Sequence, residues 1–218
     1  MNTRILANLA QLPYFTLESY KQLAGIENNH SQTARAQFVR WHQAGKVLRI
    51  KRGVYMPKAF YDSHHRDADF AAAISAIINP LSYVSSIYIL QKHALLTEVT
   101  YPVTAITTKN TRTIENDLGT YTYQHMTESL YYGFEQHLYF GITFYEAILA
   151  KALFDYLYLR PLSQLARRKS FDLAEELRLN LDELPEQVRH EFTELVGQSE
   201  VPKMEAVLAN FQEHVWLP

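Results

Sequence analysis

The sequence predicts an α+β protein with an N-terminal winged helix-turn-helix, followed by a mixed α/β body with an antiparallel sheet and C-terminal helices. Three observations predict this fold class. Residues 1–60 show three helical patterns and then two short β-rich runs, the middle of the chain is rich in Thr, Tyr, Val and Ile, and helical patterns return from Tyr145 to the end. We therefore expect a winged helix-turn-helix domain over residues 1–60 and an α+β domain over residues 61–218.

The first two helices are predicted from their end signals. One is expected over residues 3–11 and is stopped by Pro13, whose ring and missing N–H end a helix. The next is expected over residues 17–25, where the hydroxyl of Thr16 can cap the first turn and a glycine closes the last. The polar segment 26–30 is then expected to link this helix to the third.

The third helix has an amphipathic pattern. It is expected over residues 31–45, with a serine as its N-cap and a glycine at its end. Ala34, Phe38 and Trp41 recur at i, i+4 and i+7, so they share one face of the helix. We expect this face to be buried against the first two helices.

Two short β-rich runs follow this helix. They cover residues 46–50 and 54–57 and are separated by the turn 51–53, in which Gly53 can adopt the positive φ that a tight hairpin needs. A hairpin directly after a helix-turn-helix is expected to form its wing.

The charge is divided unevenly along the chain. Residues 1–60 contain nine Lys/Arg and two Asp/Glu, a net charge of +7, whereas the rest of the chain carries −9. Clustered cations are what phosphate neutralisation requires, so the N-terminal part is expected to bind double-stranded DNA. Chance segregation of solvated charge is the alternative explanation.

The residues expected to contact DNA are the polar and cationic side chains of the third helix and the hairpin. Gln pairs well with adenine and Arg with guanine in the major groove, and cations on a wing follow the backbone or enter the minor groove. A protein-docking role for the same module is the alternative. The expected residues are Gln32, Thr33, Arg35, Gln37, Arg40, Lys46, Arg49, Lys51 and Arg52.

The body is expected to begin with two helices and to continue with strands and further helices. The segment 109–119 is rich in turn-forming residues and is expected to connect the first two strands of one antiparallel sheet. The first two expected helices cover residues 68–78 and a segment that is capped by Ser85 or Ser86 and runs to Leu96. A long helix is expected from Tyr145, followed by C-terminal helices with breaks near Pro185 and Pro202. The expected strands are 102–108, 119–126 and 137–144.

Three segments together resemble the AbiEi-type antitoxins, the transcriptional-regulator half of type IV (AbiE) toxin-antitoxin systems. The run from Phe15 through the third helix to GKVLRIKRGVYMP is similar to the family's N-terminal domain, and LSYVSSIYILQKHALL is similar to its Tyr-hydrophobic-Ser turn and following helix. A later helix is matched by Lys151, Ala152, Leu153, Asp155, Leu157, Tyr158 and Leu159, although Ala150 stands where the family usually has Glu. The resemblance covers about residues 10–160.

The resemblance implies two activities. The winged helix would repress its own operon by binding repeats in the promoter, and the C-terminal domain would counteract a nucleotidyltransferase-like toxin, with no stable complex assumed. The alternatives are a stand-alone winged-helix regulator whose body senses a ligand or dimerises, and a nucleic-acid-processing enzyme that uses the winged helix for delivery.

Composition and motifs favour a protein that is not an enzyme and needs no cofactor. The chain has no cysteine, no P-loop, no GxGxxG and no GxSxG, so thiol chemistry and several nucleotide-binding and hydrolase classes are not expected. No run of about 18 apolar residues or signal-peptide pattern occurs, so we expect a cytoplasmic protein with no membrane partner.

Three side-chain groups leave more than one interpretation. The segment 63–69 gathers His64, His65, Asp67 and Asp69, but a solvated linker is favoured over a metal site. Lys151 and Asp155, at i and i+4, form either an exposed helix ion pair or a buried, satisfied one. The fifteen tyrosines are expected to pack at core edges, with stacking on nucleobases as the alternative.

Overall fold

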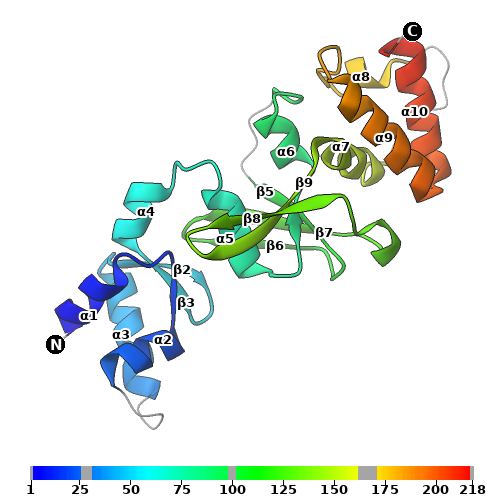
Figure 1. Ribbon diagram of the computed structural model, residues 1–218. Coiled ribbons are helices and arrows are strands. Elements are labelled where there is room, and N and C mark those ends of the chain that lie inside the picture. Colours follow the sequence, from blue (N-terminus) through cyan, green and yellow to red (C-terminus); the bar gives the residue numbers. More distant parts are fainter. Residues whose placement is uncertain (1, 26–30, 98–101, 162–170, 217–218) are drawn as a thin grey trace.

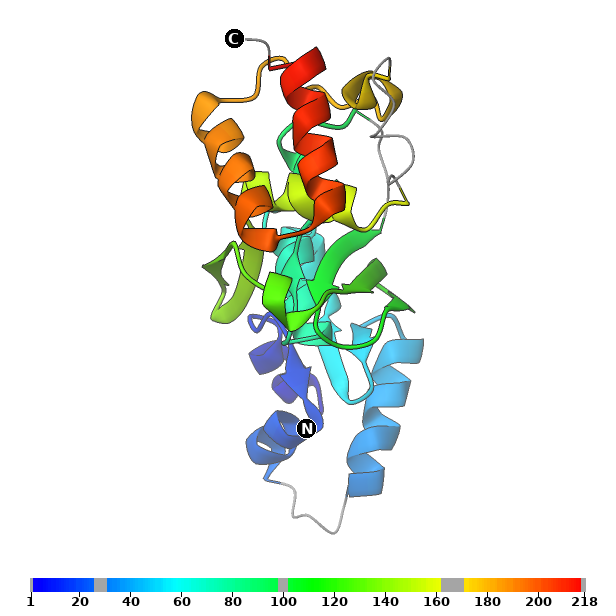
Figure 2. The same ribbon diagram turned by 90° about the vertical axis from the view of Figure 1, so that its right-hand side faces the viewer.

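The computed structural model describes residues 2–25, 31–97, 102–161 and 171–216 of this α+β protein. Figure 1 shows an N-terminal group of helices with a small sheet, a central larger sheet, and a C-terminal group of helices. Figure 2 shows these three parts stacked along one long axis, with the N-terminal group and the C-terminal helices at opposite ends. The predicted linker 26–30 lies outside the described residues.

The N-terminal group has the element order helix, strand, helix, helix, strand, strand. Its elements are α1 (Asn2–Leu9), β1 (Phe15–Thr16), α2 (Leu17–Ala24), α3 (Ser31–Gln43), β2 (Val47–Lys51) and β3 (Val54–Pro57). The strands form an antiparallel sheet in the order β1-β3-β2. The three predicted helices and the hairpin are confirmed, whereas β1 was not predicted because two residues are too few to show an alternating pattern.

The ends of α2 follow the predicted signals. The side chain of Thr16 accepts a hydrogen bond from the Ser19 amide at 3.2 Å, and the Ser19 hydroxyl lies 2.9 Å from the Thr16 amide, which completes a capping box. Gly25 ends the helix in the left-handed conformation at φ 61°. These caps satisfy backbone groups at both ends of a helix of only eight residues.

Three helices and the first strand of the larger sheet follow the hairpin along the chain. These elements are α4 (Lys58–His64), α5 (Phe70–Ile78), β4 (Tyr83–Val84) and α6 (Ile87–Lys92). The predicted helix over 68–78 is confirmed as α5, and the helix that begins after Ser86 ends before the predicted Leu96. The predicted solvated linker is wrong in part, because α4 includes His64.

The larger sheet is mixed, so the prediction of one antiparallel sheet is wrong. Its strand order is β6-β7-β5-β4-β9-β8, and the pairs β5–β7 and β4–β9 are parallel. The remaining strands are β5 (Val103–Thr107), β6 (Arg112–Asn116), β7 (Gly119–His125), β8 (Phe134–Tyr139) and β9 (Ile142–Ala147), with a short helix η2 at Glu128–Leu130. The predicted connection 109–119 is also wrong, because it contains β6, which pairs with β7.

The predicted strand 137–144 is a hairpin instead. β8 ends at Tyr139 and β9 begins at Ile142, and the two turn residues Phe140 and Gly141 both have positive φ, 46° and 78°. Two consecutive positive φ values reverse the chain in a tight turn whose twist matches that of the flanking strands. Tyr145 therefore lies in β9, and the long helix predicted from this residue begins later, as α7 (Leu149–Tyr158).

The C-terminal helices cover α7. They are α8 (Leu173–Glu176), α9 (Glu186–Ser199) and α10 (Pro202–His214), so the predicted breaks at Pro185 and Pro202 are confirmed as helix starts. Phe192 of α9 and Phe211 of α10 are fully buried and pack against Trp216. These contacts join the C-terminal end of the chain to the core of the larger sheet.

Candidate nucleic-acid interface

The inner face of α3 is fixed by aromatic packing. Ala34, Phe38 and Trp41 are 0%, 2% and 4% exposed, as their spacing predicts. The Phe38 ring lies 5.3 Å from the ring of Phe15 and 5.0 Å from that of Tyr20, in edge-to-face geometry. Burial of this face sets the rotation of the helix about its axis, so its opposite face is turned to solvent.

Three of the predicted arginines line one groove between α3 and the β2–β3 hairpin. Arg35 comes from α3, Arg49 from β2 and Arg52 from the turn, and all three are exposed. The groove has a volume of about 440 Å³ and is also lined by Val39 and Tyr55. We call it the arginine groove.

The three guanidinium groups are free to bind a ligand. Within the described part of the chain, none of them forms a hydrogen bond or an ion pair through its side chain. A guanidinium offers up to five N–H donors in a planar fork that matches phosphate oxygens. Three such groups around one groove make the groove suited to bind a polyanion. The side chain of Val39, which is 50% exposed, offers an apolar contact beside them.

The other predicted residues lie outside the groove. Gln32 and Thr33 are exposed in the first turn of α3, and Arg40 is exposed near its C-terminal end. Gln37 is half-buried and has a contact within the protein. Lys46 is exposed between the end of α3 and the start of β2.

Lys51 is turned away from the arginine groove. Its ammonium group donates to the carbonyl oxygen of Ile77 at 2.5 Å, at the C-terminal end of α5, where the partial negative charge of the helix favours a cation. Burial, and then the charge of Arg112, lower the pKa of Lys51. These hydrogen bonds connect the hairpin to α5 of the body.

A β-bulge explains why Lys51 and Arg49 point in different directions. Residues two apart on a regular strand share a face, but the register shifts between Arg49, opposite Tyr55, and Lys51, opposite Val54. Ile50 is the extra residue and is buried in the core of the larger sheet. The bulge therefore places Lys51 on the side of the body.

Asp117 is a residue of this region that the sequence analysis did not identify. It lies in the turn between β6 and β7, and its Oδ2 accepts from the backbone N–H of Arg49 at 2.7 Å and lies 2.6 Å from Nε2 of His42. The neighbouring Asn116 donates through Nδ2 to the Ile50 carbonyl at 2.9 Å. The sequence Asn-Asp-Leu-Gly over residues 116–119 indicates a turn, but nothing local in the sequence indicates that Asp117 bonds to Arg49, 68 residues away.

The body contains a buried ion pair whose carboxylate connects α7 to the β4 segment. Lys151 and Asp155 are 1% and 0% exposed and form an ion pair within α7. Asp155 Oδ2 also accepts from Ser85 Oγ at 2.7 Å and from Tyr83 Oη at 3.0 Å. Burial raises the pKa of Asp155, against the opposing effects of Lys151 and the two hydroxyl groups. The pair is therefore buried and satisfied, the second of the two predicted arrangements.

The histidines of segment 63–69 bond to separate partners. His64 Nδ1 lies 2.9 Å from Asp67, which also accepts from the Tyr139 hydroxyl at 2.7 Å, whereas His65 Nδ1 contacts the Tyr61 carbonyl. Asp69 lies 3.6 Å from Lys92. Over the described ranges, no three His, Asp or Glu side chains are grouped so as to hold a metal ion.

No protein-family model matches the chain, and no curated protein matches its sequence. The described helices include none that is long and apolar enough to cross a membrane. The assignment of function therefore rests on the residues and on their arrangement.

Proposed function

We propose that the N-terminal group is a winged helix-turn-helix that binds double-stranded DNA. The single observation that carries this proposal is the arginine groove, where a helix and a hairpin each contribute unpaired guanidinium groups to one surface. The element order of helix, strand, helix, helix and a β-hairpin is the one expected of such a module. In this assignment α3 enters the major groove, and β2–β3 is the wing.

The exposed residues of α3 and of the hairpin then have different roles. Gln32 and Arg35, on its N-terminal turns, are placed to read base edges, because the N-terminal residues of a recognition helix lie deepest in the groove. Arg49 and Arg52 on the hairpin contact phosphates. Lys51 has no direct role, since its ammonium group is bound to the end of α5.

The wider proposal is an autorepressor and antitoxin of the AbiEi type. Two points support this proposal. The first is the sequence resemblance, and the second is that two of the segments that carry it are in contact, because Asp155 of α7 accepts hydrogen bonds from Tyr83 and Ser85. The chain would repress its own operon by binding promoter repeats and would counteract a nucleotidyltransferase-like toxin encoded nearby. A neighbouring gene for such a protein, and rescue of growth when both genes are expressed, are the observations that would test this step.

The DNA-binding step is tested with the full chain and a labelled duplex from upstream of its own gene. A scrambled duplex of equal length is the competitor, and affinity is measured across a salt series. We expect preferential binding whose logarithm falls linearly with the logarithm of salt concentration. The triple change of Arg35, Arg49 and Arg52 to Ala should abolish it, whereas Arg66→Ala, an exposed arginine of the body, should not. Equal binding of both duplexes, or full binding by the triple variant, would refute the assignment.

A further inference from the structure

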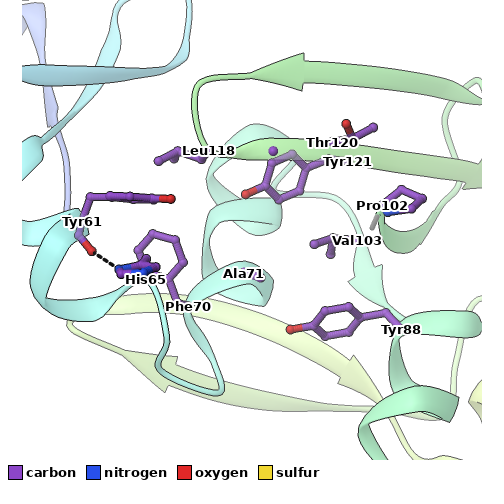
Figure 3. Close-up of a pocket in the computed structure, with 11 residues that line it drawn as sticks. Tyr61, His65, Phe70, Ala71, Tyr88, Pro102, Val103, Leu118, Thr120 and Tyr121 are labelled. Carbon is purple, nitrogen blue, oxygen red and sulfur yellow. Dashed lines mark hydrogen bonds between the residues drawn. The ribbon is translucent and has the colours of Figure 1, made fainter. Parts of the chain in front are cut away.

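A second cavity lies in the body, between α4, α5, α6 and strands β5 and β7. Its volume is about 300 Å³, within the range of small-ligand sites. Its walls are mainly aromatic and aliphatic, and Figure 3 shows Tyr61, Tyr88 and Tyr121 around the same space, with their hydroxyl groups directed toward it. We call it the tyrosine cavity. The proposed DNA interface uses none of these residues.

Tyr121 is the unusual residue of this cavity. Its side chain is 2% exposed, and its hydroxyl group forms no hydrogen bond with any described residue. Tyr123, two residues along the same face of β7, is equally buried, but its hydroxyl donates to the Ser75 carbonyl at 2.9 Å. The side chain of Tyr121 is thus buried, but its hydroxyl oxygen is not among the fully buried polar atoms of the described residues, so it is open to the cavity and can donate to a group that enters it.

The chemistry of the walls defines the ligand. Burial raises the pKa of Tyr121, and burial followed by the charge of Glu146 raises the pKa of Tyr88 to about 12, so both hydroxyls stay protonated and can donate. The described lining residues include no Lys, Arg, Asp or Glu, and the one imidazole among them, that of His65, is bonded through Nδ1 to the Tyr61 carbonyl. The rings of Tyr61, Phe70 and Tyr88 favour a flat apolar partner.

We propose that the tyrosine cavity binds a small uncharged planar ring compound that carries a carbonyl or ring-nitrogen acceptor. The ring lies between the aromatic walls, and the acceptor receives the hydrogen bond of Tyr121. This proposal does not depend on DNA binding. The cavity is nevertheless close to the hairpin contact, because Leu118 and Gly119 line it and directly follow Asp117, which bonds to Arg49.

The test uses the full chain and ligand-observed NMR with coumarin, quinoline and 1-indanone, three neutral ring compounds with one acceptor each. Naphthalene, without an acceptor, and coumarin-3-carboxylate, with a charge, are the comparison compounds. We expect saturable binding of at least one neutral acceptor compound and weaker binding of both comparison compounds. If no compound binds, the proposal is wrong. It is also wrong if the carboxylate binds as well as coumarin.

Two variants locate the binding site. Tyr121→Phe removes only a hydroxyl that bonds to none of the described residues, so the fold should be retained and the affinity should fall about tenfold, as for one lost hydrogen bond. Ala71→Leu fills the cavity from α5 and should abolish binding. Tyr145→Phe, the same change at a tyrosine outside the cavity, should leave the affinity unchanged. Unaltered affinity in both Tyr121→Phe and Ala71→Leu would place binding elsewhere and overturn the proposal.

Discussion

The carboxylate of Asp117 lies 2.6 Å from Nε2 of His42, so the β6–β7 turn of the larger sheet meets the C-terminal end of α3. The same carboxylate accepts from the Arg49 amide, and the adjacent Asn116 donates to the Ile50 carbonyl. Three residues of the proposed DNA-binding unit are thus joined by polar contacts to two residues of the β6–β7 turn. The side chain of Ile50 adds an apolar contact with the larger core. The orientation of the hairpin depends on the body.

Asp117→Ala should loosen this junction. The change removes the acceptor of the Arg49 amide and the partner of His42, and we expect a loss of stability of about 0.5–1.5 kcal/mol, typical of one or two hydrogen bonds at a partly exposed site. Hydrogen exchange of the Arg49 amide should accelerate at the same time. Asp117→Asn keeps an acceptor oxygen and should protect this amide better than Ala. Equal exchange in wild type and Asp117→Ala would contradict the role of this contact.

Asp155→Ala should be far more costly. It leaves the Lys151 ammonium group buried without its counter-charge, and removal of one partner of a buried ion pair costs about 3–5 kcal/mol. The measurement is urea-induced unfolding followed by circular dichroism. The double variant Lys151→Met, Asp155→Asn removes both charges and retains an acceptor for Ser85 and Tyr83, so it should recover a large part of the loss. A loss below 1 kcal/mol for Asp155→Ala would show that the pair is solvated.

Asp67 should make stability depend on pH in the acid range. The hydrogen bond from Tyr139, and then that of His64, lower the pKa of Asp67 in the folded protein. A carboxyl group with a lowered folded pKa contributes stability above its unfolded pKa, about 3.9, and loses it as the pH falls through the folded value. Wild type should therefore lose more stability between pH 5 and pH 2 than Tyr139→Phe, which lacks the main cause of the shift.

Urea midpoints at the two pH values provide this measurement. Tyr145→Phe is the matched control, because among the described residues the hydroxyl of Tyr145 has only a long contact, to Gln136 at 3.5 Å. It should retain the pH dependence of the wild type. Identical pH dependence in wild type and Tyr139→Phe would show that Tyr139 does not set the pKa of Asp67.

The fold was predictable where the signals are local. The i, i+4, i+7 pattern of Ala34, Phe38 and Trp41 gave the buried face of α3, and Gly53 marked the hairpin turn. The turn at Phe140 and Gly141 was missed because the apolar pattern continues through it. The parallel pairs β5–β7 and β4–β9 were missed because strand partners are set by tertiary packing, which a single alternating segment does not encode.

The candidate site was predictable as a set of cations but not as a geometry. Arg35, Arg49 and Arg52 were identified from charge and position, and the structure brings them to one groove. The bulge at Ile50 turns the side chain of Lys51 to the face opposite that of Arg49. The residue types of the hairpin do not indicate this bulge, which becomes visible only once the strand register is known. Asp117 was missed for a different reason, since its contacts link distant parts of the chain.

The contrast between Arg52 and Lys51 provides the sharpest test of the interface. Both are cations of the same hairpin, but only Arg52 lines the arginine groove, whereas Lys51 is bound to carbonyl groups of α5. Arg52→Ala should lower the slope of log affinity against log salt by about one, the effect of one lost phosphate contact, with stability unchanged. Lys51→Ala should leave the slope unchanged and lower stability by about 1 kcal/mol through the lost hydrogen bonds.

The two variants are compared by duplex titration across a salt series and by urea unfolding of the free protein. The expected pattern is a change in slope for one variant and a change in stability for the other. A lowered slope with unchanged stability in Lys51→Ala would mean that its side chain leaves α5 to reach the phosphate backbone. The hairpin would then contact DNA with the face that the bulge turns toward the body, and the proposed docking would have to be reversed.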